Sequence, residues 1–577
     1  MYKTDILVIG TGLAGAIAAI IAADNNQKVT IITKTDDIIS GSTAMAQGGI
    51  IYRGINDSKE KLLNDIMFAG AGHCWQPAVS QLVDLGTKLV DELLINRFGI
   101  NFDIVESNRH IIQSARHCEQ SVAIPEYKEI ATPSARNDGS TVSVFASETK
   151  QTTNEGIATH MARNDEKLNN NLHLTSEGAH SVRRIIHSKD LTGLTIQKAV
   201  INELQKNPNI EIRTNNIVVD LLTLSHHSKN SLDIYKHPAC FGAIVFDSKT
   251  DKTEPIFAKK TILATGGLGQ IFLHTTNPPE ATGDGIALAS RAGVRCFNLE
   301  YIQFHPTAFY NEHHNRFLIS EALRGEGGIL IDKNGNEFMS RFHSQGNLAP
   351  RDVVARSIQN IMLETSAACV YLDVSFKGEN WLRDRFPTIF NHCLKAGINI
   401  GKEPIPVVPA AHYSCGGIGV NLNGRTSLQR LYAVGEISCT GVHGANRLAS
   451  SSLLEALVWG YTAGIDVSIP KDYDEYFPEI YDWVSETEPM DAALLAQDWT
   501  SIKNTMWNYV GLIRTKQRLH RAKKMLRELQ LEIEQFYKKA KLSREIIELR
   551  NGIETAIAVT NATLEAPVSR GTHYVAE

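Results

Sequence analysis

The amino-terminal part of the chain places a glycine-rich turn between short apolar runs. Residues 5–9 read DILVI, GTGLAG follows at 10–15, AIAAIIAA is rich in Ala and Ile, and KVTIITK at 28–34 is apolar again. Apolar runs that flank a glycine turn and a helical segment are typical of a β-α-β unit in a parallel sheet. The pattern therefore predicts strand, turn, helix and strand over residues 5–34.

The segment from 78 to 98 carries large apolar residues at helical spacing, which predicts an amphipathic helix. Gly86 falls on the same face, so we expect either a close contact or a break there. The apolar positions are Val79, Leu82, Val83, Leu89, Val90, Leu93 and Leu94.

Residues 104–171 differ in character from the rest of the chain. They are rich in Asn, Ser, Thr, Glu and Lys and contain few large apolar side chains. Such a stretch buries too little apolar surface to offset its ordering entropy. We therefore expect most of it to be an exposed or poorly ordered insertion.

Strand-like apolar runs return after this insertion and are then interrupted by a polar middle segment. They lie at 217–224, 242–246 and 261–267, and the pattern resumes at 431–436. A sheet that is interrupted and then completed predicts a second domain inserted into the first. Charged helical periodicity from about Asp491 predicts a helical bundle with a solvated face. The domains that we expect cover 1–296 with 415–490, 297–414, and 491–577.

The composition excludes several classes of function. With 58 basic and 63 acidic residues, the net charge of -5 produces no field that favours nucleic acid or an acidic membrane surface. The eight Cys form no C-x-x-C pair, which argues against an iron–sulfur cluster, a zinc site or a disulfide framework and fits reduced thiols. An apolar strand begins almost at Met1, and no apolar run approaches bilayer length. We therefore expect a cytoplasmic protein with no signal peptide, membrane helix, nucleic-acid partner or bound metal.

The glycine turn matches the dinucleotide-binding pattern G-x-G-x-x-G. Its placement between a strand and a helix lets the backbone approach a pyrophosphate at the helix amino-terminus. The second strand ends in Thr33-Lys34 and lacks the acidic residue that usually binds the ribose of NAD, which weakens an NAD interpretation. The motif consists of Gly10, Thr11, Gly12, Leu13, Ala14 and Gly15.

The next segment, GSTAMAQGGI at 41–50, is composed mainly of small residues. Its backbone N–H groups could lie against a flat ring system, and Ser42, Thr43 and Gln47 could donate hydrogen bonds. A plain loop rich in small residues explains this segment equally well.

Several longer motifs, taken together, resemble the succinate dehydrogenase/fumarate reductase flavoprotein superfamily. The resemblance covers nearly the whole chain apart from the insertion. Beside GTGLAG and GSTAMAQGG, the motifs are ATGG (264–267), TTNPPEATGDGIALASRAG (275–293), QFHPTAF (303–309), EALRGEGG (321–328), LAPRDVVAR (348–356), PAAHYSCGGIGV (409–420) and VGEISCTGVHGANRLASSSLLEAL (434–457).

This resemblance implies an α/β fold with a Rossmann-like FAD-binding domain, an inserted α+β capping domain and a C-terminal helical bundle. It also implies FAD as the cofactor. In succinate dehydrogenases and membrane fumarate reductases a His attaches FAD covalently, and that position is Ser42 here, so we expect noncovalent FAD. The implied contacts are Thr11 to Ala14 for the pyrophosphate, Lys34 for the adenosine end, and Ser42, Thr43, Ala44, Met45, Ala46, Gln47, Gly48 and Gly49 for the isoalloxazine, completed by Asp284, Glu436, Ser452 and Leu453.

The resemblance further implies a site for a dicarboxylate, for which Arg is the suited side chain. His412 and Arg447 would bind one carboxylate, and His305 and Ser320 the other; the family commonly has Thr at the latter position. Arg351 would deliver a proton when fumarate is reduced and orient the substrate during oxidation. Arg324 and Glu326 would pair with these groups or support them. Taken singly, each His could be a core residue and Arg351 part of a solvated ion pair.

The segment LTSEGAHSVRR at 174–184 is, by itself, a charge cluster typical of a solvated surface. In superfamily members that oxidise L-aspartate, the matching segment has the form HLT-x-EG-x-HS-x-RR, and residues 173–184 keep each defined position. This resemblance places Glu177 beside the substrate ammonium, where opposite charge favours L-aspartate over a dicarboxylate without an amine.

The implied reaction is hydride transfer from the α-carbon of L-aspartate to flavin N5, which gives iminoaspartate, the first step of NAD biosynthesis from aspartate. O₂ or fumarate would reoxidise the flavin, giving peroxide or succinate, and the product could pass to quinolinate synthase by transient contact. Two alternatives are a soluble fumarate reductase or succinate dehydrogenase-type flavoprotein, and a flavin-binding scaffold without catalysis.

Overall fold

The structure is a computed structural model that describes residues 2–105, 172–311, 316–470, 476–481 and 488–576. Nearly all of the polar insertion expected at 104–171 lies outside the described residues. The chain forms two compact units, Met1–Asn101 with Leu174–Glu577, and Phe102–His173. In the second unit the described residues include an antiparallel bridge between Ile104 and Leu172.

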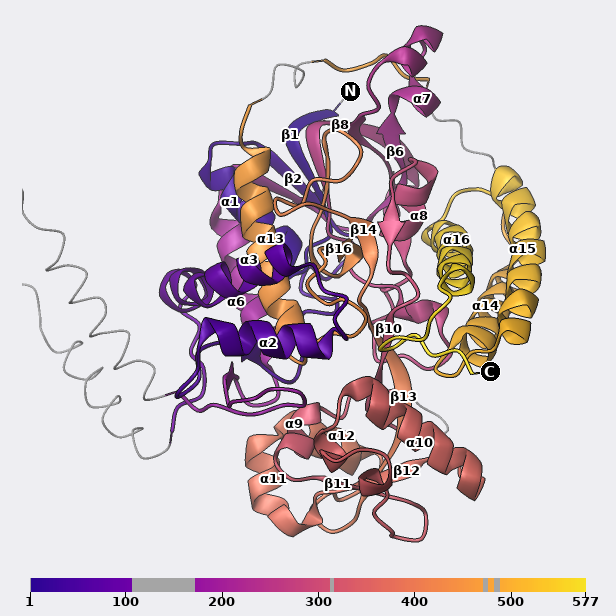
Figure 1. Cartoon of the computed structure of the whole chain (residues 1–577). Helices are drawn as coiled ribbons and strands as arrows, with labels where there is room; N and C mark the ends of the chain where they lie inside the picture. Colours follow the sequence, from indigo (N-terminus) through magenta and orange to yellow (C-terminus); the bar gives the residue numbers. More distant parts are fainter. Residues whose placement is uncertain (1, 106–171, 312–315, 471–475, 482–487, 577) are drawn as a thin grey trace, which may run out of the picture. The chain divides into compact units, whose positions relative to one another are not determined.

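The first unit is built on a mixed sheet in the order β5-β2-β1-β8-β7-β6, with β15 beside β8 (Figure 1). The pairs of β1 with β2 and β8, of β2 with β5, and of β15 with β8 are parallel, whereas β7 is antiparallel to both neighbours. The strands are β1 Tyr2–Ile9, β2 Val29–Ile32, β5 Ile210–Arg213, β6 Asn216–Thr223, β7 Cys240–Asp247, β8 Lys252–Leu263 and β15 Leu431–Ala433.

The predicted β-α-β unit is confirmed, and the sheet is interrupted after β8 and completed by β15, as expected. The strand expected at 261–267 differs, because β8 begins at Lys252 and ends at Leu263. Residues 264–267 instead form a loop at the carboxyl ends of the parallel strands, where α/β proteins bind ligands.

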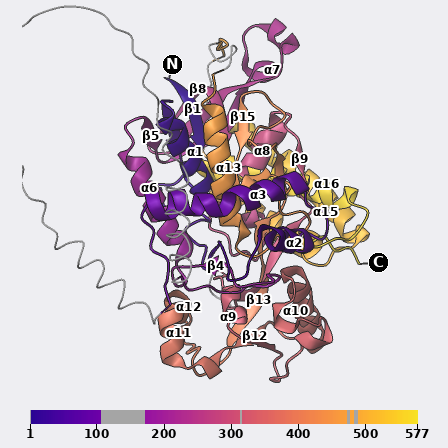
Figure 2. The ribbon, with the colours of Figure 1, turned by 60° about the vertical axis from the view of Figure 1, so that its left-hand side comes forward.

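Helices α1 Leu13–Asp24, α13 Ser451–Val467, α6 Thr192–Lys206 and α3 Gln76–Leu89 pack together beside the sheet (Figure 2). Two glycines permit the close approach of α13 to α1, since a Cβ on Gly460 would lie 2.7 Å from the carbonyl oxygen of Ala14 and one on Gly464 2.8 Å from Cβ of Ile21. The helix predicted from 78 to 98 is α3, continued as a π-helix over Val90–Arg97. Gly86 makes a close contact, because a Cβ there would lie 2.7 Å from the Leu454 side chain.

A second, antiparallel sheet in the order β10-β13-β12-β11 has its own apolar core (Figure 1). Its strands are β10 Ile302–Phe309, β11 Ile329–Ile331, β12 Val370–Asp373 and β13 Ile405–Ser414, and its helices are α9 Glu321–Gly325, α10 Arg351–Thr365, α11 Glu379–Arg385 and α12 Pro387–Lys395. The other elements in the described part of the chain are α2 Lys59–Ala69, α7 Leu224–His227, α8 Asp284–Arg291, β3 Ile50–Ile51, β4 Ile185–Ile186, β9 Cys296–Phe297, β14 Gly417–Gly419 and β16 Ser438–Cys439. Short 3₁₀ turns lie there at Ser231–Tyr235, Gly269–Ile271, Met339–Arg341, Gly346–Leu348, Ser375–Lys377 and Gly435–Ile437.

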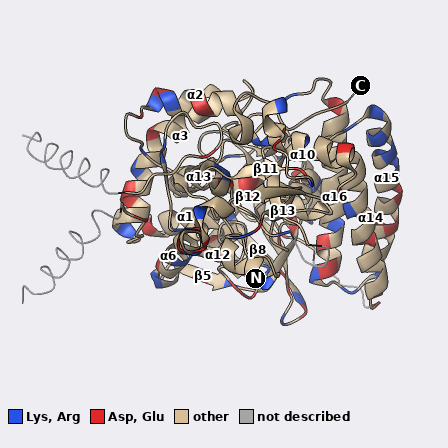
Figure 3. Cartoon of the chain, turned by 90° about the horizontal axis from the view of Figure 1, so that it is seen from below, with Lys and Arg blue, Asp and Glu red and all other residues tan. Residues whose placement is uncertain are grey.

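Three helices follow at the carboxyl end, α14 Ala492–Val510, α15 Lys516–Lys539 and α16 Arg544–Glu565. Their apolar residues join the core of β6, β7 and β8. The buried stripe of α15, which contains Leu519, Leu526 and Ile533, faces inward, and its charged residues of both signs lie on the outside, as the periodicity predicted (Figure 3). None of the helices that the structure describes is both long and apolar enough to cross a membrane.

Candidate active site

A cavity extends from the carboxyl ends of the parallel strands to the second sheet. The residues proposed to clamp and recognise the substrate all line it: Glu177, His305, Ser320, Arg351, His412 and Arg447. Most residues assigned to the cofactor do so too: Gly10, Thr11, Gly12, Leu13, Ala14, Lys34, Ser42, Thr43, Met45, Ala46, Gln47, Gly48, Gly49, Asp284, Glu436, Ser452 and Leu453.

Two residues assigned to the cofactor do not line the cavity. A Cβ on Gly15 would lie 2.2 Å from the carbonyl oxygen of Gly10 and 2.9 Å from Cβ of Ala264. Gly15 thus allows α1 to pack closely on the strand ends. Ala44 lies half-buried between Thr43 and Met45 without reaching the cavity wall.

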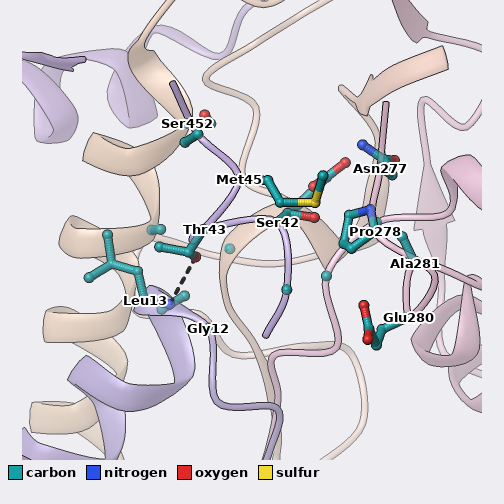
Figure 4. Close-up of a pocket in the computed structure, with 18 of the residues that line it drawn as sticks. Gly12, Leu13, Ser42, Thr43, Met45, Asn277, Pro278, Glu280, Ala281 and Ser452 are labelled. Carbon is teal, nitrogen blue, oxygen red and sulfur yellow. Dashed lines mark hydrogen bonds between the residues drawn. The ribbon is translucent and has the colours of Figure 1, made fainter. Parts of the chain in front are cut away.

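The glycine turn places the amino-terminus of α1 at the cavity wall. Gly10 has φ +114°, and a Cβ on it would lie 2.2 Å from the carbonyl oxygen of Ala264. Gly12 precedes α1 without a side-chain cap, and the N–H of Leu13 donates to Oγ1 of Thr43 at 3.2 Å (Figure 4). Nε2 of Gln197 on α6 donates to the carbonyl of Thr11 at 2.7 Å and holds the turn in place. The dipole and N–H groups of such a helix end favour an anion.

Several polar atoms in the cavity wall lack a partner within the described structure. They include three buried side-chain oxygens: Oε1 of Gln47, Oγ1 of Thr265 and Oε2 of Glu280. Figure 4 labels the Glu280 side chain. Buried polar groups are almost always hydrogen-bonded, so these atoms fit a ligand with its own donors and acceptors. The wall therefore suits a large polar cofactor with ring and hydroxyl groups, such as FAD. Sequence reasoning did not find Thr265 or Glu280.

At one end of the cavity, Lys34 is held by two carboxylates. Its Nζ lies 2.6 Å from Oδ2 of Asp284 and 2.8 Å from Oε1 of Glu548, and it donates to Oγ1 of Thr282 at 2.7 Å. Burial alone would lower the pKa of Lys34, but the two carboxylates together raise it above the usual value. Glu548 belongs to α16, as does Asn551, whose amide donates to Asp284 at 3.0 Å. The last described helix thus holds two residues of the cavity wall, Lys34 and Asp284, in place, and no local motif indicated it.

At the other end, two arginines are joined through one glutamine. Nη1 of Arg351 donates to Oε1 of Gln303 at 3.1 Å, and Nε2 of Gln303 donates to the carbonyl of Arg447 at 2.8 Å. The Arg447 guanidinium lies 4.4 Å from the centre of the Tyr413 ring and donates to Ser452 at 3.2 Å. Its buried Nε has no hydrogen-bond partner among the described residues. This end of the cavity therefore concentrates positive charge that a dianionic ligand would neutralise.

The two histidines lie side by side in this positive region, with ring centres 5.0 Å apart. Burial lowers the pKa of His305 well below its usual range, and Arg351 adds to the effect. Burial also lowers the pKa of His412, as do His305 and Arg351. Both rings are therefore neutral donors near pH 7. Ser320 caps α9 by accepting the N–H of Ala322 at 3.2 Å, which leaves its O–H hydrogen for donation.

The segment 174–184 is not a surface charge cluster, since Glu177 and Arg184 are buried. Oε2 of Glu177 accepts from Oγ of Ser450 at 2.7 Å, and a Cβ on Gly48 would lie 2.6 Å from Oε1 of Glu177. Arg184 pairs with Asp57 at 2.9 Å and also with Asp65. The two arginine-bound acids anchor the segment and let it present Glu177 to the cavity.

Glu177 faces a second acid, Glu321, and their environments differ. Burial raises the pKa of Glu177, and the negative charge of Glu321 raises it further. Burial acts in the same direction on Glu321, but Arg351 and Arg324 outweigh it and hold its pKa below the usual value. Arg324 lies 3.3 Å from Glu321, as expected, whereas Glu326 lies 3.9 Å from Lys377 and does not line the cavity.

Two family models match the chain. One, described as an FAD binding domain, matches residues 5–453, and the other, described as the C-terminal part of fumarate reductase flavoproteins, matches residues 499–577.

Curated relatives resemble the chain over nearly all of its length. The L-aspartate oxidase of Pseudomonas aeruginosa is 38% identical over 577 residues, which cover 99% of this chain and 95% of that protein. L-aspartate oxidase 1 of Ralstonia nicotianae is 37% identical over 573 residues, covering 99% and 94%. A chloroplastic L-aspartate oxidase of Nicotiana tabacum is 39% identical, with 99% of this chain and 81% of that protein covered.

Solved structures support the fold. A quinol-fumarate reductase with menaquinol molecules has a TM-score of 0.78 at 23% identity, covering 100% of this chain and 92% of the other. The Sdh1 complex of Mycobacterium smegmatis with UQ1 has a TM-score of 0.73 at 25% identity, covering 100% and 89%. These likenesses agree with an α/β FAD-binding fold with capping and helical parts.

Proposed function

Since the chain belongs to the L-aspartate oxidase family and carries its FAD binding domain, we propose that it oxidises L-aspartate to iminoaspartate with noncovalently bound FAD. The redox chemistry, hydride acceptance from the substrate α-carbon and electron transfer to O₂ or fumarate, would be supplied by bound FAD. The observation that carries the proposal is a buried acid, Glu177, beside a pocket of two arginines and two neutral histidines. That arrangement matches an ammonium group between two carboxylates.

The cofactor is held mainly by backbone and small side chains in this proposal. The turn from Thr11 to Ala14 binds the pyrophosphate at the start of α1, and Lys34 with Asp284 binds the adenosine end. The segment from Ser42 to Gly49 lies against the isoalloxazine. The histidines that line the described cavity are His305 and His412, outside this segment, which supports noncovalent attachment.

The two substrate carboxylates are bound by different parts of the chain. His412 and Arg447 bind one, and His305 and Ser320 bind the other. Nδ1 of His412 lies 2.8 Å from Oγ1 of Thr276, so we assign Nε2 as the substrate-facing nitrogen. Neutral imidazoles donate hydrogen bonds without competing with the arginines for charge compensation.

Arg351 has two roles in the proposal. Glu321 and Gln303 fix its guanidinium, so it can orient L-aspartate for oxidation. In fumarate reduction it supplies a proton to the carbanion that forms beside it. An Arg is a weak acid in water, with a pKa above about 12, and donates only to a strongly basic carbon positioned against it.

Anaerobic titration tests this function. L-aspartate is expected to bleach the flavin absorbance of the purified holoenzyme, and readmission of O₂ to restore it with formation of peroxide. Acid precipitation is expected to leave the yellow colour in the supernatant, which supports noncovalent FAD. A flavin that succinate reduces and L-aspartate does not would establish the fumarate reductase-type alternative instead.

A further inference from the structure

The last described residues of the chain, 569–576, form a strap after α16. The backbone N–H of Arg514 donates to the carbonyl of Tyr574 at 3.1 Å, and that of Ala576 donates to the carbonyl of Arg514 at 2.7 Å. Nη1 of the fully buried Arg514 lies 2.7 Å from Nδ1 of His573. The strap is thus anchored to the loop between α14 and α15, and Figure 1 shows it in yellow running beside β10.

One side of the strap forms hydrogen bonds with the loop that contains Arg447. The N–H and Oγ1 of Thr572 both donate to the carbonyl of Ala445 at 3.0 Å. Gly571 has φ +52°, and a Cβ on it would lie 2.4 Å from the same carbonyl oxygen. The contact therefore needs a glycine at this position.

The other side of the strap contacts α10, whose first residue is Arg351. Nη1 of Arg356 donates to the carbonyl of Gly571 at 3.0 Å, and its guanidinium lies 5.3 Å from the centre of the Tyr574 ring. Arg356 also lies 2.8 Å from Asp352, which accepts from the amide of Asn446 at 2.9 Å.

We infer that the strap is a positioning element that sets the spacing between the Arg351 and Arg447 guanidinium groups. Arg351 begins α10, whereas Arg447 lies in the loop between β16 and α13, and the two are linked inside the cavity through Gln303. The strap ties their supporting backbones together through residues that do not line the cavity. The placement of the substrate depends on that spacing, because misplacement by about 1 Å can cost about a hundredfold in rate. The inference rests on the proposed function, in which Arg447 binds a substrate carboxylate and Arg351 orients the substrate.

Two matched pairs of variants test the strap in the holoenzyme. Gly571→Ala pushes the strap off Ala445, and its control is Gly397→Ala, an exposed position at φ +88° where a Cβ meets nothing within 4 Å. Thr572→Val removes the hydroxyl donor, and its control Thr572→Ser keeps it. Succinate affinity is measured from the perturbation of flavin absorbance, with KM and kcat for L-aspartate beside it.

Gly571→Ala is expected to weaken succinate binding by about tenfold or more relative to Gly397→Ala and to raise KM more than it lowers kcat. Thr572→Val is expected to show a smaller change that Thr572→Ser lacks. FAD content and melting temperature should follow the controls. Succinate affinity within about twofold of the control, or loss of FAD in step with loss of affinity, would overturn the inference.

Hydrogen exchange without any dicarboxylate separates this inference from the proposed function. Gly571→Ala should speed amide exchange in both the 443–447 loop and α10, and Gly397→Ala should not. If the wild-type protein binds no dicarboxylate, the proposed function fails while this measurement still tests the strap. Unchanged exchange in both segments contradicts the strap even where L-aspartate is oxidised normally.

Discussion

The two ends of the cavity differ in the groups that line them. Apart from Lys34 and its two carboxylate partners, the proposed cofactor end consists mainly of glycines, a helix amino-terminus and small side chains, where an added Cβ would clash. The proposed substrate end consists of buried charged side chains such as Arg351, Glu321 and Arg447, each needing its partners. FAD affinity should therefore be sensitive to atoms added at the glycine turn. Turnover of L-aspartate should be sensitive to the loss of charged side chains at the other end.

The largest effect is expected from Arg351→Leu. Losing the guanidinium removes a substrate contact and leaves Glu321 with one arginine fewer, which costs about 4 kcal/mol, or roughly a thousandfold in kcat/KM for L-aspartate. FAD content should stay at the wild-type value. The control is Arg383→Leu, an exposed position paired with Glu379. Loss of FAD together with activity would show that the two ends do not act separately.

Gly10→Ala tests the opposite end by adding one methyl group. The added Cβ would lie 2.2 Å from the carbonyl oxygen of Ala264, so the turn must shift. We expect FAD affinity to fall about a hundredfold in reconstitution of the apoprotein followed by flavin fluorescence. Gly72→Ala, at φ +66° with nothing within 4 Å of a Cβ, controls for backbone strain. Equal affinities in the two variants would contradict a backbone cradle.

Glu177→Gln sharpens the comparison within the substrate end. The amide keeps the size of the side chain and loses the charge that faces the ammonium. We expect kcat/KM for L-aspartate to fall about 30-fold and fumarate reduction to change less than about 3-fold. Glu326→Gln, which removes a carboxylate outside the cavity, serves as the control. Parallel losses in both reactions would refute the role of Glu177 in recognising the amine.

The pH dependence of the two reactions should also differ, with a smaller effect than the substitutions above. Burial and the charge of Glu321 raise the pKa of Glu177, so the free enzyme loses the negative charge of that carboxylate as the pH falls through that pKa. We expect kcat/KM for L-aspartate to fall about tenfold per pH unit below it. The rate of fumarate reduction should not fall in this pH range. The Glu177→Gln variant should likewise show no such fall in kcat/KM for L-aspartate. A fall of equal size in the fumarate reaction would assign the titration to another group.

Local patterns predicted the elements that local forces determine. The glycine turn, the Ala/Ile-rich α1 and the charged periodicity of α15 all appear where expected, because each depends on neighbours in sequence. The start of β8 was missed, since residues 252–255 are exposed or half-buried and Lys259 and Lys260 interrupt the apolar run that begins at Ile256. Gly86 had two interpretations that only its distance from Leu454 could separate.

Long-range contacts were beyond prediction from the residues alone. Glu548 reaches Lys34 only because α16 packs against α8, and Glu280 lies in a family motif that gave no sign of its unpaired oxygen. The segment around Glu177 shows the same limit. Its charges alone indicated a solvated surface, and only the family resemblance placed Glu177 in the site. The pairing of Arg184 with Asp57 and Asp65 could not be read from the residues. The family resemblance located the substrate residues, and their roles stay predictions.

The pairing of Lys34 with Glu548 also has a consequence for biosynthesis. Lys34 follows the amino-terminal β-α-β unit and leaves the ribosome long before Glu548, which lies on α16. The sheet can form during translation, but Glu548 can pair with Lys34 only after α16 has emerged and docked. We therefore expect truncation before α16 to leave a folded sheet that retains FAD poorly, because the cavity residues Lys34 and Asp284 would lose Glu548 and Asn551.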